Sequence, residues 1–133
     1  MAELYLGKWK LEDANKEMFN AYLEGLGVGF VTRKAACAVS ADVTISLEGD
    51  IWTIKTSSTF KTYEIKFKLG IQFDEETADD RKVKTTVTLD KGVLIQEQKW
   101  DGKTTTIKRE VIDGKLIVTC IIGDVVCVRT YKR

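Results

Sequence analysis

The clearest structural signal lies between Val83 and Tyr131, where the chain reads VKTTVTLDKGVLIQEQKWDGKTTTIKREVIDGKLIVTCIIGDVVCVRTY. Apolar and polar residues alternate along it, which is typical of half-buried β-strands with one face towards a core. Turn signals interrupt the alternation every ten to twelve residues, at Asp90-Lys91-Gly92, Asp101-Gly102-Lys103, Asp113-Gly114-Lys115 and Gly123-Asp124. This spacing predicts consecutive antiparallel hairpins.

The same period of two extends upstream to about Val39, through residues 43–47 and 63–67, and a first strand is expected over residues 7–11. About ten strands joined by short connections favour an all-β fold, an up-and-down antiparallel barrel, because closure removes exposed sheet edges. A barrel of about ten strands should enclose a cavity that side chains alone do not fill.

Residues 14 to 36 interrupt the strands with a helical pattern. Asp13 or Asn15 can cap the start of a first helix, Gly25 and Gly27 can end it, and a second helix is expected over residues 28–36. This helix-turn-helix pair has the right size to cover one end of the barrel. The apolar residues of the first helix recur at helical spacing and form one stripe: Met18, Phe19, Tyr22, Leu23 and Leu26.

Composition limits the classes of function. A chain of 133 residues, 44% hydrophobic and 31% charged, has the size and balance of one globular domain spanning residues 1–133. The net charge of +1 argues against nucleic acid as a partner, because phosphate binding usually needs a basic excess. The chain has no His, so the commonest metal ligand and general base is missing, and we expect neither a metal site nor catalysis.

Cysteine usage and the N-terminus both suggest a cytoplasmic protein. Cys37, Cys120 and Cys127 form no CxxC motif, so we expect reduced and mostly buried thiols. The opening residues 1–5 lack the basic and apolar regions of a secretory signal. No apolar run approaches the ~20 residues that a membrane-spanning helix needs.

Two arginines stand among apolar residues in the late strands. Arg109 shares a strand face with Thr105, Ile107 and Val111, and Arg129 shares one with Val125, Cys127 and Tyr131. An inward guanidinium needs a counter-charge, since its desolvation is otherwise unfavourable. These two strands offer no inward Asp or Glu, so a ligand carboxylate would supply the charge, with the Tyr131 hydroxyl as a further donor. The alternative is the opposite register, in which both arginines face water.

Other candidate sites are weaker. The glycine-rich segment 25–29 follows a helix and lacks the dinucleotide-binding fingerprint. The acidic residues of segment 74–80 lack an EF-hand frame, and we interpret them as a solvated turn. Large aromatic residues are assigned to the core: Trp9, Trp52, Trp100, Phe67 and Phe73.

Motifs along nearly the whole chain resemble those of the intracellular lipid-binding proteins, which are calycins, and specifically the cellular fatty-acid-binding proteins of the heart, adipocyte and myelin subgroup. They are Gly7-Lys8-Trp9-Lys10-Leu11, Leu26-Gly27-Val28-Gly29-Phe30, Thr32-Arg33-Lys34, Ser58-Thr59-Phe60-Lys61, Phe73-Asp74-Glu75, Thr77-Ala78-Asp79-Asp80-Arg81-Lys82-Val83-Lys84, Gln98-Lys99-Trp100-Asp101-Gly102 and Arg129-Thr130-Tyr131. The segments Met18-Phe19-Asn20 and Ser40-Ala41-Asp42 depart from the family pattern. These departures affect the expected lid and portal and leave the arginine site unchanged.

The resemblance implies a lipocalin-like barrel of ten antiparallel strands capped by two short helices. It implies that Arg129 and Tyr131 bind a fatty-acid carboxylate directly, with Arg109 as a third partner or acting through water. The residues that it assigns to the ligand tail are Phe19, Tyr22 and Leu23. Those that it assigns to the portal are Val28, Ala36, Thr59, Phe60, Ala78 and Asp79.

The resulting expectation is a monomeric cytoplasmic carrier that binds long-chain fatty acids reversibly, without a cofactor, for transport between membranes and enzymes. Lys16, Arg33 and Lys34 lie on or near the lid and are candidates for contact with anionic membranes. Two alternatives stay open. The arginine site suits any hydrophobic carboxylic acid, including retinoic acid, and the lid of a signalling module could dock onto protein partners.

Overall fold

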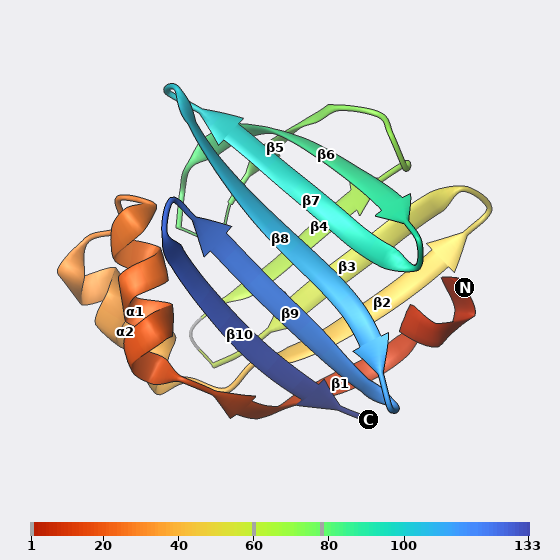
Figure 1. Ribbon diagram of the computed structural model, residues 1–133, viewed down its shortest axis with the longest axis horizontal. Coiled ribbons are helices and arrows are strands. Elements are labelled where there is room, and N and C mark those ends of the chain that lie inside the picture. Colours follow the sequence, from red (N-terminus) through yellow and green to blue (C-terminus); the bar gives the residue numbers. More distant parts are fainter. Residues whose placement is uncertain (1, 60, 78) are drawn as a thin grey trace.

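The computed structural model describes residues 2–59, 61–77 and 79–133. Within this range the chain forms a short 3-10 helix (η1), ten strands and two α-helices (Figure 1). Their bounds are η1 Ala2–Tyr5, β1 Gly7–Ala14, α1 Lys16–Gly25, α2 Phe30–Ala38, β2 Asp42–Glu48, β3 Ile51–Ser57, β4 Thr62–Phe67, β5 Phe73–Glu76, β6 Lys82–Asp90, β7 Val93–Trp100, β8 Lys103–Ile112, β9 Lys115–Ile122 and β10 Val125–Lys132.

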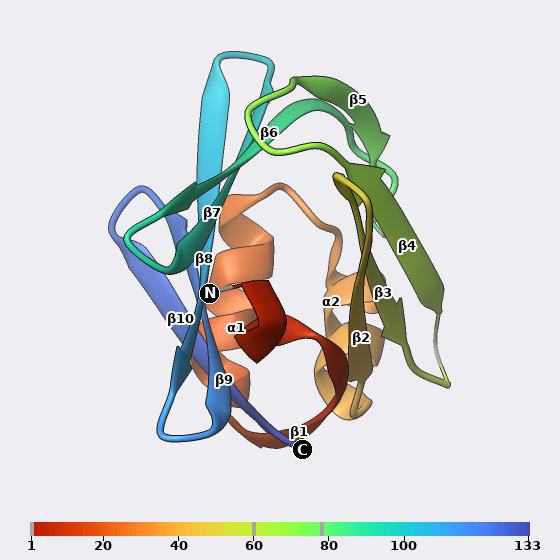
Figure 2. The same cartoon turned by 90° about the vertical axis from the view of Figure 1, so that its right-hand side faces the viewer.

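All ten strands belong to one antiparallel sheet in the order β4-β3-β2-β1-β10-β9-β8-β7-β6-β5. Because β1 pairs with β10, the sheet curls round and brings the first and last strands side by side (Figures 1 and 2). The ten-stranded barrel is thereby confirmed, but backbone closure is incomplete, since β4 and β5 end the sheet. Tyr63 of β4 donates a hydrogen bond to Glu75 of β5, so side chains bridge this opening.

The expected hairpin turns form where the sequence placed them. Asp101 and Gly102 have φ of 45° and 74°, and Asp113 and Gly114 have φ of 52° and 77°. Two successive residues with positive φ characterise the type I′ turn, whose twist matches that of the adjoining strands. The Asp-Gly pairs therefore fix the register of β7, β8 and β9.

The barrel end remote from the α-helices is packed with aromatic side chains. The indole N–H of buried Trp9 donates to the Tyr5 carbonyl oxygen at 2.9 Å. The rings of Trp52 and Phe67 stack with centroids 6.3 Å apart, and Phe67 and Phe73 stack at 6.1 Å. The core assignment is confirmed for Trp9, Trp52 and Phe67, while Phe73 and Trp100 are half-buried and pack against this core.

The helix pair covers the other end of the barrel (Figure 1). Asn15 caps α1 by accepting a hydrogen bond from the Met18 N–H at 3.1 Å. Tyr22 and Leu23 of α1 are buried. Met18, which was expected in the same apolar stripe, is exposed. Helix α2 starts at Phe30 rather than at Val28 and has no fully buried residue, although Ala36 and Cys37 pack against the core. In the described part of the chain, neither helix has the length and hydropathy to cross a membrane.

Candidate functional site

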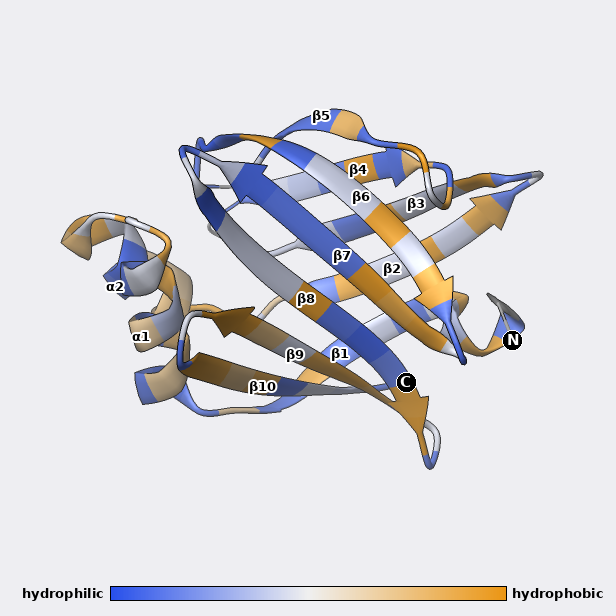
Figure 3. Ribbon diagram, turned by 45° about the horizontal axis from the view of Figure 1, so that its top comes forward, coloured by the Kyte–Doolittle hydropathy of each residue, from blue (hydrophilic) through white to orange (hydrophobic). Residues whose placement is uncertain are grey.

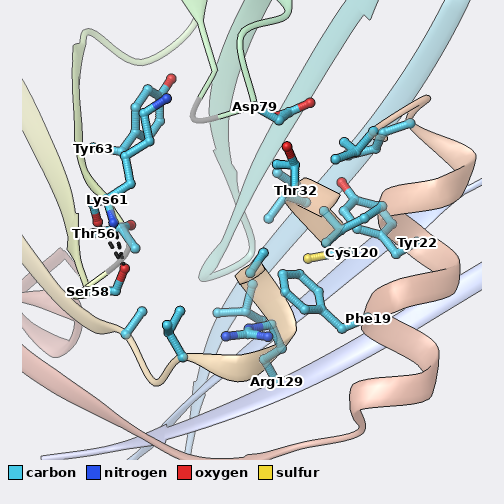
Figure 4. Close-up of a pocket in the computed structure, with 18 of the residues that line it drawn as sticks. Phe19, Tyr22, Thr32, Thr56, Ser58, Lys61, Tyr63, Asp79, Cys120 and Arg129 are labelled. Carbon is cyan, nitrogen blue, oxygen red and sulfur yellow. Dashed lines mark hydrogen bonds between the residues drawn. The ribbon is translucent and has the colours of Figure 1, made fainter. Parts of the chain in front are cut away.

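A cavity of about 280 Å³ lies between the helix pair and the barrel wall. Figure 4 shows Phe19, Tyr22 and Arg129 on one side of it and Lys61 and Tyr63 on the other. Its lining combines apolar side chains with a few charged ones, which is typical of a site for an amphipathic ligand. The lining residues are Phe19, Tyr22, Leu23, Leu26, Val28, Thr32, Ala36, Val39, Ala41, Thr56, Ser58, Lys61, Tyr63, Asp79, Arg81, Gln98, Ile107, Arg109, Val118, Cys120, Arg129 and Tyr131.

The strand register brings the two arginines to one place. Val118 of β9 is the pairing partner of Arg109 in β8 and also of Arg129 in β10. The arginines therefore lie two strands apart at one level, roughly 10 Å between their backbones, on the same face of the sheet. Both line the cavity, so the register that turned them towards water is wrong.

Arg129 is 9% exposed and has no acidic side chain as a partner in the described residues. Its Nε donates to the Tyr131 hydroxyl oxygen at 3.3 Å. Its guanidinium carbon lies 4.1 Å from the centre of the Phe19 ring, which is a cation–π contact. A guanidinium in this setting can receive an anionic group that enters the cavity.

Arg109 makes a different contact. Its Nη1 donates to Gln96 Oε1 at 2.7 Å. Burial lowers the pKa of Arg109, and the charge of Glu75 is one of the influences that oppose this shift. Part of its surface stays accessible because it faces the cavity. An arginine remains protonated at neutral pH in any protein environment, so two positive charges face the same space.

A polar wall that the sequence pattern did not reveal stands beside Arg109, formed by Glu75 and its hydrogen-bond donors. Glu75 is 6% exposed and accepts hydrogen bonds from Thr85 Oγ1 at 2.6 Å, Gln98 Nε2 at 3.1 Å and Gln96 Nε2 at 3.3 Å. Tyr63 donates to its other carboxylate oxygen. Four donors around one group complement a carboxylate. A buried acid therefore lies within the barrel.

The interpretation of residues 74–76 as a solvated turn is wrong. They belong to β5, in which Phe73 and Glu75 face the interior while Asp74 and Glu76 are exposed. The alternation of Phe73 with Glu75 is the signal that could have revealed the inward acid. It was overlooked because a run of three carboxyl groups is usually solvated.

Three of the predicted portal residues, Val28, Ala36 and Asp79, line the cavity. Asp79 lines the cavity and pairs with Arg81, whose Nε is 2.5 Å from Asp79 Oδ2. Burial alone would raise the pKa of Asp79, but the hydrogen bond and charge of Arg81 outweigh it, so the pKa is lowered. Lys61 and Asp80 form an ion pair at 3.5 Å that joins the β3–β4 and β5–β6 connections. Phe60 and Ala78 lie outside the described residues.

Besides Asp79, five residues predicted for the tail and portal line the cavity, namely Phe19, Tyr22, Leu23, Val28 and Ala36. Thr59 is exposed and is not among the lining residues. Thr105 donates its only hydroxyl proton to the Ile121 carbonyl oxygen, so Tyr22 is the donor in its 2.7 Å hydrogen bond with Thr105. This bond ties α1 to the strand beneath it.

The cysteines contribute an apolar surface. Cys120 lines the cavity, and burial raises the pKa of its thiol to about 12. Burial also raises the pKa of Cys127. Thiols with raised pKa values are poor nucleophiles at neutral pH. In the described part of the chain, no cluster of His, Cys, Asp or Glu side chains is arranged to hold a metal ion.

Comparisons with known proteins agree with this fold. The chain is 53% identical to an adipocyte fatty acid-binding protein of Pygoscelis papua over 133 residues, which is 100% of this chain and 99% of the relative. A fatty acid-binding protein from Drosophila melanogaster brain tissue has a similar structure, with a TM-score of 0.89 and 52% identity over 97% of this chain and 99% of that one. A Schistosoma mansoni fatty acid binding protein, solved in complex with arachidonic acid, matches with a TM-score of 0.93 and 40% identity over 99% and 97% of the two chains.

The family comparison spans residues 6–133 and so includes both arginines, the polar wall and the helix pair. With the barrel, the helical cap and the relatives in agreement, the chain belongs to the lipocalin / cytosolic fatty-acid binding protein family.

Proposed function

We propose that this protein is an intracellular carrier that binds long-chain fatty acids reversibly in its barrel cavity. The observation that carries the proposal is the pair Arg109 and Arg129 facing an otherwise largely apolar cavity. Arg129 and Tyr131 hold the carboxylate directly, Arg109 adds charge, and Phe19, Tyr22 and Leu23 contact the tail. Relatives named as fatty acid-binding proteins, one of them in complex with arachidonic acid, support this assignment.

The energetics favour reversible binding. Burial of a ~16-carbon chain at about 0.8 kcal/mol per methylene contributes roughly 12 kcal/mol. The lost freedom on association costs roughly 4–15 kcal/mol and cancels much of this gain, while a charge-assisted head-group contact adds about 1.5–3 kcal/mol. Dissociation constants in the nanomolar to micromolar range correspond to about 8–12 kcal/mol and follow when the association cost is near the lower end of its range. The tail therefore supplies most of the affinity, and the arginine site supplies selectivity for an acid.

We further propose that residues 1–133 act as one monomeric domain in the cytoplasm and bind without catalysis. Membership of all ten strands in one sheet supports the single domain. The lack of His in the chain supports binding without proton-transfer chemistry. The proposed entry route is marked by Val28, Ala36, Thr59 and Asp79, together with the positions Phe60 and Ala78.

We propose a transient contact of the helix pair with anionic membranes during ligand transfer. Phe30 and Val31 are 66% and 80% exposed at the start of α2, and the ammonium of exposed Lys34 lies 5.8 Å from the Phe30 ring centre. An apolar tip beside a cation suits the interface of an acidic bilayer. Exposed Lys16 can add charge.

Arg33 is the third cation that the sequence suggested for this contact, but its guanidinium forms hydrogen bonds within the helix pair. Its side chain is 15% exposed, and its Nη1 donates to the Val28 carbonyl oxygen at 2.7 Å. Its Nε donates to Asn20 Oδ1 at 3.1 Å. Arg33 therefore links α2 to α1, and it is left out of the proposed membrane contact.

The test is native mass spectrometry of the purified protein, followed by extraction and identification of the co-purified lipid. The delipidated protein is then titrated with palmitic acid, retinoic acid and 1-hexadecanol. We expect one bound molecule per chain and the tightest binding for palmitic acid. Tighter binding of retinoic acid would favour a retinoid carrier, and absence of binding to all three compounds would refute the carrier function.

A further inference from the structure

The two arginines of the cavity differ in their access to a counter-charge. Arg109 is connected to Glu75 through a single amide, because Gln96 accepts from Arg109 at 2.7 Å and donates to Glu75 at 3.3 Å. Arg129 has the Tyr131 hydroxyl and the Phe19 ring as its partners instead. The charge of Arg109 is therefore partly compensated by Glu75, whereas the charge of Arg129 has no anionic partner among the described residues.

Glu75 is held firmly in this position. Its donors come from three other strands: Tyr63 from β4, Thr85 from β6, and Gln96 and Gln98 from β7. In the described part of the chain, no buried side-chain nitrogen or oxygen lacks a hydrogen-bond partner. Since all four donors converge on it, a turn of the carboxylate away from Arg109 would break these hydrogen bonds.

We propose that Glu75 is a built-in counter-anion of Arg109, which stabilises the empty cavity and limits how tightly the cavity binds an anionic head group. The inference rests on the proposed function, in which a ligand carboxylate enters beside the arginines. Charges in a poorly solvated interior act over longer distances than charges in water. Glu75 therefore attracts Arg109 in the empty protein and repels the carboxylate of a bound fatty acid.

This arrangement suits a carrier that must also release its ligand. Two buried guanidinium groups without any acid would destabilise the empty barrel. They would also strengthen binding, because an anionic ligand would relieve that instability. With Glu75 in place, the empty barrel is more stable and the affinity for an anionic ligand is lower.

The decisive variant is Glu75→Gln. Glutamine keeps the shape of the side chain, and its Oε1 can still accept from Thr85, Gln96 and Gln98, while its amide can donate to the Tyr63 oxygen. We expect the affinity for palmitic acid to rise about tenfold, with the affinity for 1-hexadecanol unchanged. The melting temperature of the empty protein should fall by about 3–6 °C.

The matched control is Glu97→Gln. Glu97 lies between Gln96 and Gln98 in β7, but it is exposed and on the outer face. The same charge change there should leave both affinities unaltered. An unchanged or weaker affinity of the Glu75→Gln variant for palmitic acid would overturn the proposal, and so would equal gains for the acid and the alcohol.

A second experiment needs no ligand and therefore separates this inference from the carrier function. The double variant Glu75→Gln, Arg109→Gln removes both charges, and its melting temperature should exceed the value expected from adding the two single effects. If Glu75→Gln alone does not fold, recovery of folding in the double variant is the same result. Simple additivity, or failure of the double variant to fold, would refute the pairing of Glu75 with Arg109 even if the wild-type protein binds fatty acids.

Discussion

The two ends of the barrel are built from the same alternating strands but differ in what points inward. At the end remote from the helices, Trp9, Trp52 and Phe67 are buried, with the Trp52 ring edge-on to Tyr5 and stacked on Phe67. At the helix end, the inward positions of β9 and β10 hold smaller or charged side chains such as Val118 and Arg129, and a cavity remains. Stability is therefore concentrated at the packed end and ligand binding at the hollow end.

The strands of the barrel also differ in hydropathy. Hydrophobic residues dominate β9, whereas β8 carries more hydrophilic ones (Figure 3). The hollow end is held largely by polar links, such as the hydrogen bond of Tyr22 to Thr105 and the ion pair of Lys61 with Asp80. Such links can break and reform without unfolding the barrel, which permits lid motion in microseconds to milliseconds.

The largest effect is expected from Trp52→Ala at the packed end. The indole ring is buried and contacts the rings of Tyr5 and Phe67, so its removal should lower the free energy of unfolding by about 3–5 kcal/mol. Urea denaturation monitored by circular dichroism measures the change. Phe19→Ala is the matched control at the hollow end, where a cavity already exists and a loss of less than about 2 kcal/mol is expected. Equal losses would contradict the difference in packing.

Arg129→Gln should have the next largest effect, on binding at the hollow end. The loss of a charge-assisted contact should weaken the binding of palmitic acid by about 1.5–3 kcal/mol, roughly 10- to 150-fold. The affinity for 1-hexadecanol should stay nearly unchanged. Competition binding with both ligands measures the split. Lys132→Gln, on the exposed face of the same strand, is the control for net charge. Similar losses for the acid and the alcohol would show that the head group binds elsewhere.

A smaller effect concerns the pH dependence of the portal. Because Arg81 depresses the pKa of Asp79 below its ordinary value of 3.8, Asp79 stabilises the fold at any pH above about 4. Asp79→Asn should therefore lower the free energy of unfolding by about 1 kcal/mol at pH 7. The difference in the free energy of unfolding between Asp79→Asn and wild type should shrink as the pH falls through the lowered pKa of Asp79. Urea titrations between pH 7 and pH 2.5 measure it.

Asp80→Asn is the control for the portal experiment, because Asp80 is largely exposed in its ion pair with Lys61. Its effect should stay below about 0.5 kcal/mol at every pH. A loss at Asp79 that persists unchanged at pH 2.5 would mean that packing, rather than charge, holds the portal connection.

The smallest effect is expected at the surface of the lid. Lys34→Glu should slow fatty-acid transfer to vesicles that contain phosphatidylserine and should reduce the salt dependence of transfer, at about 1 kcal/mol per charge. Stopped-flow transfer of a fluorescent fatty acid measures both. Lys68→Glu, at the packed end, makes the same change in charge and should have no effect. Identical transfer rates for Lys34→Glu and wild type would refute the proposed membrane contact.

Much of the hollow end could be predicted from local pattern. The Asp-Gly turns set the register, and the alternation put Arg109 and Arg129 on mainly apolar strand faces, which the structure shows to point into the cavity. Glu75 was missed because its partners, Gln96 and Gln98, come from a distant strand, and an acidic run alone gives no sign of buried donors. The same reason applies to Arg33, which looks like a free surface cation until α1 supplies Asn20.

The amino-acid sequence by itself determined the strands, their turns and the mainly apolar strand faces that carry the two arginines, because these depend on alternation and on backbone preferences over a few residues. Only the tertiary structure decided that the arginines face inward, which inward charges meet, where the sheet stays open and which end is hollow. These features depend on contacts between β4, β5, β7 and β8, whose side chains come together only when the sheet curls.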